Sequence, residues 1–153
     1  RMSVQGILSQ CNELTTVVVR NVPDYWEVQD LVSLLWWQGF SLDVNFAYVP
    51  LHISSEVALG YAVVNMANQA KAQQFMGQIQ GMRVPNQEKA LVVEWCRKIQ
   101  GLDGMVDRYR NSKVMHPNIA DRQKPMVFHN GMPIRFPGPN RNVNAPKLRP
   151  VHL

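Results

Sequence analysis

Residues 59–66 read LGYAVVNM, and this stretch decides the fold prediction because its side chains alternate in size and polarity. A period of two is typical of a strand whose two faces meet different surroundings. One face carries Gly60, Ala62, Val64 and Met66, and the other carries Leu59, Tyr61, Val63 and Asn65. The stretch therefore predicts a strand over about 57–66, with the first set against helices and the second facing solvent or a ligand.

Strand and helix patterns alternate on both sides of this stretch. Upstream, LTTVVVRNV (14–22) and VNFAYV (44–49) are rich in β-branched and aromatic residues and end at prolines, which predicts two strands. Downstream, LVVEWC (91–96) predicts a fourth strand. Apolar residues at helical spacing predict one helix after a capping box that starts at Asp24 and another helix after Asn68. The resulting order, βαββαβ, is an α+β, ferredoxin-like plan.

The chain continues past this plan. Four residues repeat at helical spacing and predict an extra helix over about 102–110: Leu102, Met105, Val106 and Tyr109. Periodicity fades after Pro117, and seven of the ten prolines lie beyond residue 116. The sequence therefore predicts a domain over 13–113 that includes the extra helix. A segment over 1–12 precedes it, and a basic, proline-rich, partly irregular extension over 114–153 follows it.

Charge is distributed unevenly along the chain. Residues 1–96 hold five basic and eight acidic residues, net −3, whereas residues 97–153 hold eleven basic and three acidic residues, net +8. A basic extension is typical of proteins that meet nucleic acid or acidic partners. The alternative is a solvated tail that only aids solubility.

Composition and motifs exclude several other classes of protein. No apolar run approaches the ~20 residues of a membrane-spanning helix, and residues 1–10 lack the apolar core of a secretory signal. Two cysteines, Cys11 and Cys96, cannot form a disulfide framework or a four-ligand zinc site. No phosphate-binding loop, nucleophile elbow or metalloprotease motif occurs, and the four histidines are isolated. We therefore expect an intracellular protein that is not an enzyme and needs no cofactor or metal.

The two strands expected at the centre of the sheet resemble the two ribonucleoprotein signatures of the RNA recognition motif. The run VVVRNV (17–22) fits the first signature, and LGYAVVNM fits the second at its Gly, Tyr, Ala and final Val positions. In that fold, outward aromatic side chains of these strands stack on RNA bases. Tyr61 is the one aromatic residue at the three usual stacking positions, because Val18 and Val63 occupy the other two.

Longer runs in the same order resemble the Mei-two-like family. They are LTTVVVRNVP (14–23), YVPLHISSEVALGYAVVNM (48–66), KIQGLDGMVDRYRNSKVM (98–115) and KPMVFHNG (124–131). The resemblance covers roughly residues 13–131. It implies a variant RNA recognition motif with a C-terminal extension, in a regulator of meiosis or of growth and differentiation. The family usually keeps an aromatic residue where Val63 stands, and often another near Cys96.

The resemblance and the strand alternation together predict a site for single-stranded RNA on the open face of the sheet. We expect Tyr61 to stack on a base, and Arg20, Lys98 and the basic extension to neutralise phosphates. The full set of predicted contacts is Val18, Arg20, Asn21, Tyr48, Tyr61, Val63, Asn65, Lys98, Gln100, Arg108 and Arg110. The expected role is post-transcriptional regulation in the nucleus, the cytoplasm or both.

Two questions stay open at this level. The extra helix packs either against the helical side of the domain or across the sheet, where it would occlude RNA. The second candidate function is a degenerate RNA recognition motif that binds a protein partner through an exposed tryptophan or helix face. Because Trp36 and Trp37 are adjacent, we expect one to pack on the sheet and the other, with Trp26, to be available to a partner.

Overall fold

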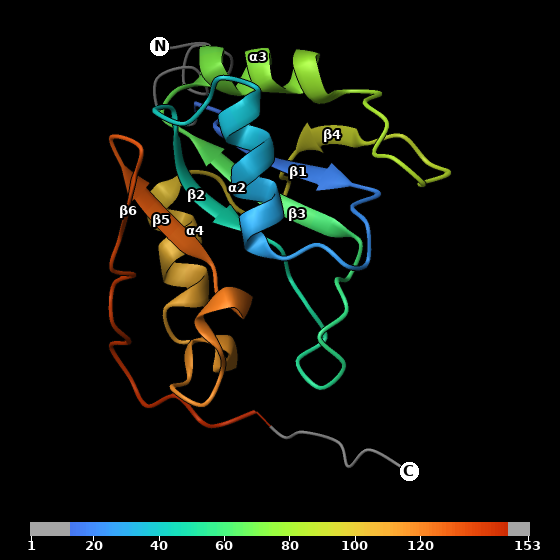
Figure 1. The fold of residues 1–153 in the computed structure, drawn as a ribbon. Helices are drawn as coiled ribbons and strands as arrows, with labels where there is room; N and C mark the ends of the chain where they lie inside the picture. The colour runs from blue at the N-terminus through green and yellow to red at the C-terminus, as the bar shows by residue number, and fades with distance from the viewer. Residues whose placement is uncertain (1–12, 147–153) are drawn as a thin grey trace, which may run out of the picture.

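The four strands and two helices of the predicted plan are present in the predicted order. The computed structural model describes residues 13–146 (Figure 1). The elements are β1 (Thr16–Arg20), α2 (Val28–Trp37), β2 (Val44–Tyr48), β3 (Tyr61–Met66), α3 (Gln69–Ile79) and β4 (Val92–Trp95). They build an antiparallel sheet in the order β4-β1-β3-β2, which two later strands extend beyond β2. The ferredoxin-like prediction is confirmed.

All four strands are shorter than predicted, and for two of them, β1 and β3, the backbone shows why. β1 ends at Arg20 because Asn21 has a φ of +68°, and β3 starts at Tyr61 because Gly60 has a φ of +100°. Positive φ values lie outside the extended region of the backbone, so neither residue continues a strand. Arg20 and Tyr61 are cross-strand partners, so both strands stop at the same edge of the sheet.

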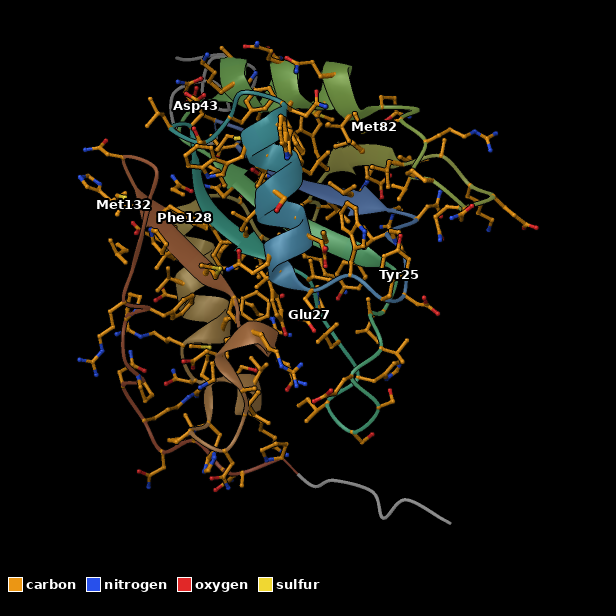
Figure 2. All side chains as sticks on the ribbon, in the orientation of Figure 1. Tyr25, Glu27, Asp43, Met82, Phe128 and Met132 are labelled. Carbon is orange, nitrogen blue, oxygen red and sulfur yellow. The ribbon has the colours of Figure 1, made fainter. Side chains whose placement is uncertain are left out.

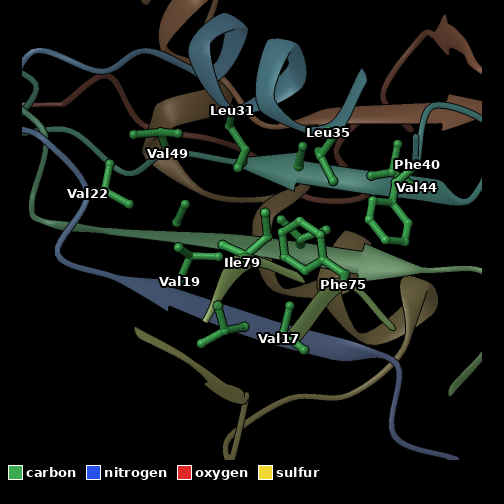
Figure 3. Close-up of a cluster of buried hydrophobic side chains, with 14 of the residues drawn as sticks. Val17, Val19, Val22, Leu31, Leu35, Phe40, Val44, Val49, Phe75 and Ile79 are labelled. Atoms are coloured by element: carbon green, nitrogen blue, oxygen red, sulfur yellow. The ribbon is translucent and has the colours of Figure 1, made fainter. Parts of the chain in front are cut away.

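The main core lies between one face of the sheet and helices α2 and α3 (Figure 3). Val17 and Val19 of β1 meet Leu31 and Leu35 of α2 and, from α3, Phe75 and Ile79. The rings of Phe40 and Phe75 pack edge to face, with centroids 5.4 Å apart. Ala62, Val64 and Met66 lie in this core, whereas Tyr61 and Val63 lie on the opposite face. The alternation predicted for residues 59–66 is therefore confirmed over β3.

Helix α2 begins later than its predicted capping box. Its N-cap is Glu27, not Asp24, and the Glu27 N–H donates to the Asp30 carboxylate at 2.8 Å. The intervening residues form a turn in which the Trp26 N–H donates to the Pro23 carbonyl at 3.1 Å. Trp26 is buried in the core. Burial of this large ring holds the turn and delays the helix.

The expected positions of the tryptophans were wrong. Trp26 is buried, whereas Trp36 and Trp37 are 60% and 87% exposed. The buried residues of α2 are Val28, Leu31 and Leu35, which are spaced by three and four and define the inner stripe of the helix. Trp36 and Trp37 come after that stripe and lie on the outer side.

Helix α4 (Leu102–Tyr109) answers the question about the extra helix, because it covers the sheet face opposite α2 and α3 (Figure 1). Two 3₁₀ turns follow, at Lys113–Met115 and Asp121–Gln123. No helix within residues 13–146 is long and apolar enough to cross a membrane.

The region after Pro117 is more regular than the sequence suggested, because it adds two strands. They are β5 (Met126–His129) and β6 (Met132–Ile134), and β5 pairs with β2 through Phe46 and Val127. Asn130 and Gly131 join them with φ values of +50° and +81°, as a two-residue hairpin requires. Figure 2 places Met132 at the rim of the molecule and Phe128 further in, in agreement with their exposures of 66% and 6%.

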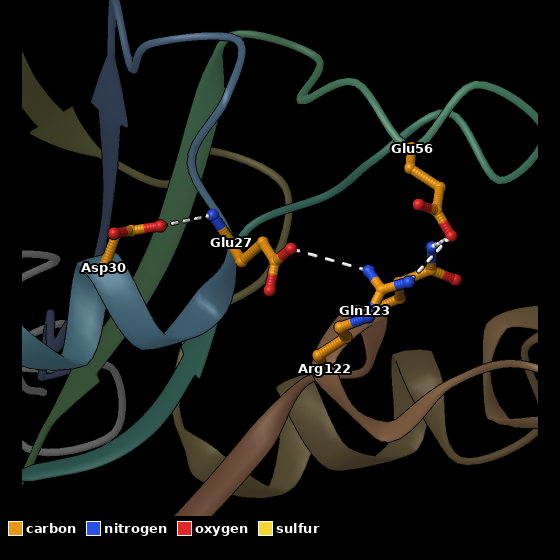
Figure 4. A network of polar contacts seen from close by, with 5 residues as sticks. All are labelled: Glu27, Asp30, Glu56, Arg122 and Gln123. Atoms are coloured by element: carbon orange, nitrogen blue, oxygen red, sulfur yellow. Dashed lines mark hydrogen bonds and ion pairs between the residues drawn. The ribbon is translucent and has the colours of Figure 1, made fainter.

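Polar contacts tie this extension to the domain (Figure 4). The Arg122 guanidinium lies 2.9 Å from the Glu56 carboxylate and 3.4 Å from that of Glu27. The Gln123 amide also donates to Glu56, at 2.8 Å. Because the ion pairs are exposed, they contribute little to stability. They orient the extension, while apolar packing of its β5 strand holds it in place.

Candidate nucleic-acid interface

Helix α4 divides the outer face of the sheet into a covered half and an open half. The covered half is centred on β2, where Phe46 and Tyr48 lie beneath α4. The Tyr109 ring stacks on Phe46 at 5.9 Å between centroids and meets Tyr48 edge to face at 4.9 Å. Met105 and Val106 complete the contact. This apolar packing closes the β2 side of the sheet to a ligand.

The start of α4 is fastened to β1 by Gln100. Its side-chain oxygen accepts hydrogen bonds from the backbone N–H groups of Thr15 (2.9 Å) and Thr16 (2.8 Å). Its side-chain nitrogen donates to the carbonyls of Thr16 (2.9 Å) and Cys96 (2.8 Å). Gly101, with φ +90°, then donates its N–H to the Thr16 hydroxyl at 2.8 Å. These bonds occupy the Gln100 amide, so the prediction that Gln100 contacts RNA is corrected to a structural role.

Three further predicted contacts are buried. Asn65 is 2% exposed: its oxygen accepts from the Thr15 and Thr16 hydroxyls at 2.8 and 2.6 Å, and its nitrogen donates to Asn45 at 2.7 Å. Tyr48 and Val63 lie in the cluster under α4. All three residues are on the outer face of the sheet. Tyr48 and Val63 pack under α4, and hydrogen bonds occupy the Asn65 amide, so Tyr48 and Asn65 are corrected to structural residues. Val63 also lines the hollow described below.

Burial also controls the charge of the tyrosines under α4. It is the largest cause that raises the pKa of Tyr48 well above its ordinary value, and it raises the pKa of Tyr109 as well. Nearby Arg108 opposes both increases but is outweighed. Both phenols therefore remain neutral at physiological pH and add no negative charge to the surface.

A groove of about 450 Å³ lies between α4 and the open half, which is built from β1, β3 and β4. We call this hollow the groove; it is lined by Val18, Arg20, Tyr61, Val63, Lys98, Arg108 and Tyr109, with β4 residues at its side. Tyr61 is half-buried on its floor, and Val18 lies beside it on β1, where it pairs with Val63. The groove thus combines an accessible aromatic ring with apolar floor residues.

The rim of the groove is basic. Arg97, Lys98 and Arg108 are exposed, and none of them makes an ion pair within residues 13–146. The Arg108 guanidinium lies 5.2 Å from the centre of the Tyr109 ring, within range of a cation–π contact. Arg20 differs from these three because its Nε donates to the Glu94 carboxylate. Three available cations therefore surround one aromatic platform, an arrangement suited to phosphates and an unpaired base.

The structure brings together six of the predicted contacts and separates two others. The six that line the groove are Val18, Arg20, Tyr61, Val63, Lys98 and Arg108. Arg110 instead donates from Nε and Nη2 to the Gly138 carbonyl, at 3.0 and 2.8 Å, and lines a different hollow.

Asn21 forms the turn after β1, and its side chain donates to the Ala90 carbonyl at 2.9 Å.

Sequence reasoning did not select Arg97 or Tyr109 as contacts. Arg97 adjoins Lys98 in a basic pair, which was a usable signal. Tyr109 belongs to the apolar stripe of α4, so its place at the groove depends on how that helix packs.

The topology defines the class of protein before any comparison is made. A βαββαβ chain with the sheet order β4-β1-β3-β2 and both signature runs on the central strands has the RNA recognition motif fold. Sequence similarity at 25–30% identity over most of the chain then supports a Mei2-like RNA recognition motif. The resemblance found in the sequence is thereby confirmed.

Two curated relatives illustrate this similarity. Protein MEI2-like 1 of Arabidopsis thaliana is 26% identical over 147 residues, which are 95% of this chain and 15% of that protein. Meiosis protein mei2 of Schizosaccharomyces pombe is 30% identical over 139 residues, 88% of this chain and 18% of that protein. The chain therefore spans less than a fifth of the length of these two relatives. No family model matches the chain.

Solved structures similar to the chain include RNA recognition domains. The Sex-lethal RNA recognition domains 1 and 2 from Drosophila melanogaster are 23% identical with a TM-score of 0.48, covering 54% of this chain and 50% of that one. The Rna15 RRM with bound RNA (GU) is 11% identical with a TM-score of 0.49, covering 61% of this chain and 94% of that one.

Proposed function

We propose that the chain is an RNA-binding domain that holds a short unpaired RNA segment in the groove between α4 and the open half of the sheet. The observation that carries the proposal is the groove itself, where Tyr61 lies among three cations that have no acidic partner within residues 13–146. Mei2-like proteins are RNA-binding regulators rather than enzymes, so no catalytic step is proposed. The proposed role is post-transcriptional regulation inside the cell, with meiosis as the setting that the name of the yeast relative supports.

Each part of the groove has a distinct role in this proposal. Tyr61 stacks on one base, which contributes about 1–3 kcal/mol. Lys98 and Arg108 contact the phosphates on either side of that base, and Arg97 extends the basic rim. Because α4 forms one side of the groove and narrows the access to Tyr61, a single strand enters more readily than the wider duplex. The proposed ligand is therefore single-stranded.

A binding measurement with matched variants tests the proposal. We expect residues 1–153 to bind a labelled random single-stranded RNA, with an affinity that falls steeply as salt rises. Tyr61→Ala should weaken binding by about tenfold, because one stacking platform is lost. Arg108→Ala should weaken it and reduce the salt dependence by about one phosphate contact.

The control is Lys71→Gln on α3, which removes one charge from the helical side of the domain, away from the groove. It should bind like the wild type. Absence of RNA binding at low salt would contradict the proposal and would direct attention to a protein partner. Equal losses for Arg108→Ala and Lys71→Gln would show that net charge, not the groove, is responsible.

A further inference from the structure

A second hollow of about 580 Å³ continues from the groove at the edge of the sheet where β1 and β3 stop, and Arg20 and Tyr61 line both spaces. The other walls of this hollow come from three connections. They are the turn after β1 at Asn21, the residues before β3 at Leu59 and Gly60, and the loop 86–89 between α3 and β4. We call this space the edge hollow. It lies beside the aromatic platform, on the far side of Arg20.

The position of α4 makes the edge hollow relevant to a bound strand. The helix is held at its start by the Gly101–Thr16 hydrogen bond and after its end by the two bonds from Arg110 to the Gly138 carbonyl. Met105, on the inner side of the helix, is buried against the sheet. A strand seated on Tyr61 therefore finds the β2 side closed, and it leaves the platform along β1 and β3. In one of these two directions it enters the edge hollow.

The side chains of the edge hollow suit a nucleotide. Asn86 and Gln87 provide amides that both donate and accept hydrogen bonds, as needed to read the edge of an unpaired base. Lys89 is exposed and makes no ion pair within residues 13–146. Leu59, which is 43% exposed, provides an apolar surface in the same wall. The wall also contains Glu88, a carboxylate that accepts hydrogen bonds from base amino groups.

We propose that the edge hollow is a second nucleotide subsite, contiguous with the groove. A nucleotide next to the one on Tyr61 places its base edge against Asn86 and Gln87 and its phosphate near Lys89. The subsite rests on the proposed function, because the strand reaches it from the groove. The RNA path on this domain then runs past the ends of β1 and β3 instead of across β4, β1, β3 and β2.

Length-dependent binding separates the two sites. The probes are labelled uridylates from a mononucleotide to a decanucleotide and a random-sequence decanucleotide, measured with the wild type, Lys89→Gln and the double variant Asn86→Gly/Gln87→Ala. Glycine at position 86 keeps the φ of +65° accessible, so the double variant removes amides without straining the loop. Lys71→Gln serves as the charge control, and thermal unfolding checks that every variant is folded.

We expect the double variant to bind the random decanucleotide about fivefold more weakly than the wild type, while the two bind the mononucleotide, which fills only the Tyr61 site, equally. Lys89→Gln should lower the slope of log affinity against log salt by about 0.7 for the decanucleotides. If the loop variants match the wild type at every length while Tyr61→Ala does not, the subsite is excluded and the groove stands. If the wild type binds none of the probes, both proposals are overturned.

Discussion

Glu94 carries a negative charge among basic residues of the groove. Its carboxylate accepts a hydrogen bond from Arg20 at the junction of the groove and the edge hollow, where every other charged neighbour in the groove is basic. Both side chains are about half exposed, so the pair adds little stability. The main effect of the Glu94 carboxylate is to compete with RNA, because it binds Arg20 and its charge repels a phosphate. Glu94 therefore weakens binding at a place where the other residues favour it.

Replacing Glu94 by Gln should strengthen binding of single-stranded RNA severalfold at low salt, because Arg20 gains a phosphate and a repulsive charge is lost. The gain should shrink at high salt, since ions screen exposed charges. A fluorescence titration of both proteins at two salt concentrations measures this. Asp43→Asn, which removes a charge outside the groove, should show no such gain. Weaker binding by Glu94→Gln would mean that the carboxylate contacts a base directly.

At the scale of the element, α4 is what distinguishes this domain. Its stripe of apolar and aromatic residues faces the sheet and buries Phe46, Tyr48 and Val63. The connection 96–101 between β4 and α4 decides this placement, since Gln100 bonds at the same time to β1 and to Cys96, the residue after β4. The helix thus covers the β2 side of the sheet and at the same time forms one wall of the groove.

Tyr109→Ala should destabilise the fold by about 2–4 kcal/mol, because the ring leaves its contacts with Phe46 and Tyr48 and a cavity remains under α4. Urea unfolding followed by circular dichroism measures the change. The matched control is Tyr25→Ala, whose ring is 60% exposed and which should cost less than about 1 kcal/mol. Equal losses for the two variants would contradict the assignment of Tyr109 as the anchor of α4.

At the scale of the whole molecule, the extension and the domain share one sheet and one apolar cluster. β5 adds to β2, while Val114, Ile119 and Val127 pack with Phe46 in the cluster under α4. The boundary at residue 113 predicted from composition therefore falls within a continuous sheet and cluster. We expect residues 13–131 to unfold as one cooperative unit, because the apolar cluster and the sheet continue from the domain into the extension.

Ile119→Ala, which truncates a buried side chain of the extension, should lower the free energy of unfolding by about 2–4 kcal/mol. Hydrogen exchange measured residue by residue tests the cooperativity. The most protected amides of β1 and β5 should lose protection by the same amount if they open together. Loss of protection confined to β5 and β6 would show that the extension opens independently of the domain.

Local patterns in the sequence were sufficient to predict the order of elements and the two faces of β3, and with them that Val18, Tyr61 and Val63 lie on the same face of the sheet. These features depend on side-chain periodicity and on neighbouring residues, which the chain states directly. The β5–β6 hairpin was missed although Asn130-Gly131 is a typical hairpin signal, because the surrounding prolines suggested irregular structure.

The amino-acid sequence by itself determined the RNA recognition motif plan, the amphipathic character of α4 and the basic character of the chain that follows β4. Only the tertiary structure decided which surface α4 covers, and with it the burial of Tyr48 and Val63, the hydrogen bonds that occupy Asn65 and Gln100, and the shape of the groove. The physical reason is that an apolar stripe is attracted to any apolar surface, since the hydrophobic effect has no direction. The choice between the two faces of the sheet is made by long-range bonds, above all those of Gln100 with Thr15 and Thr16, which join residues more than eighty positions apart.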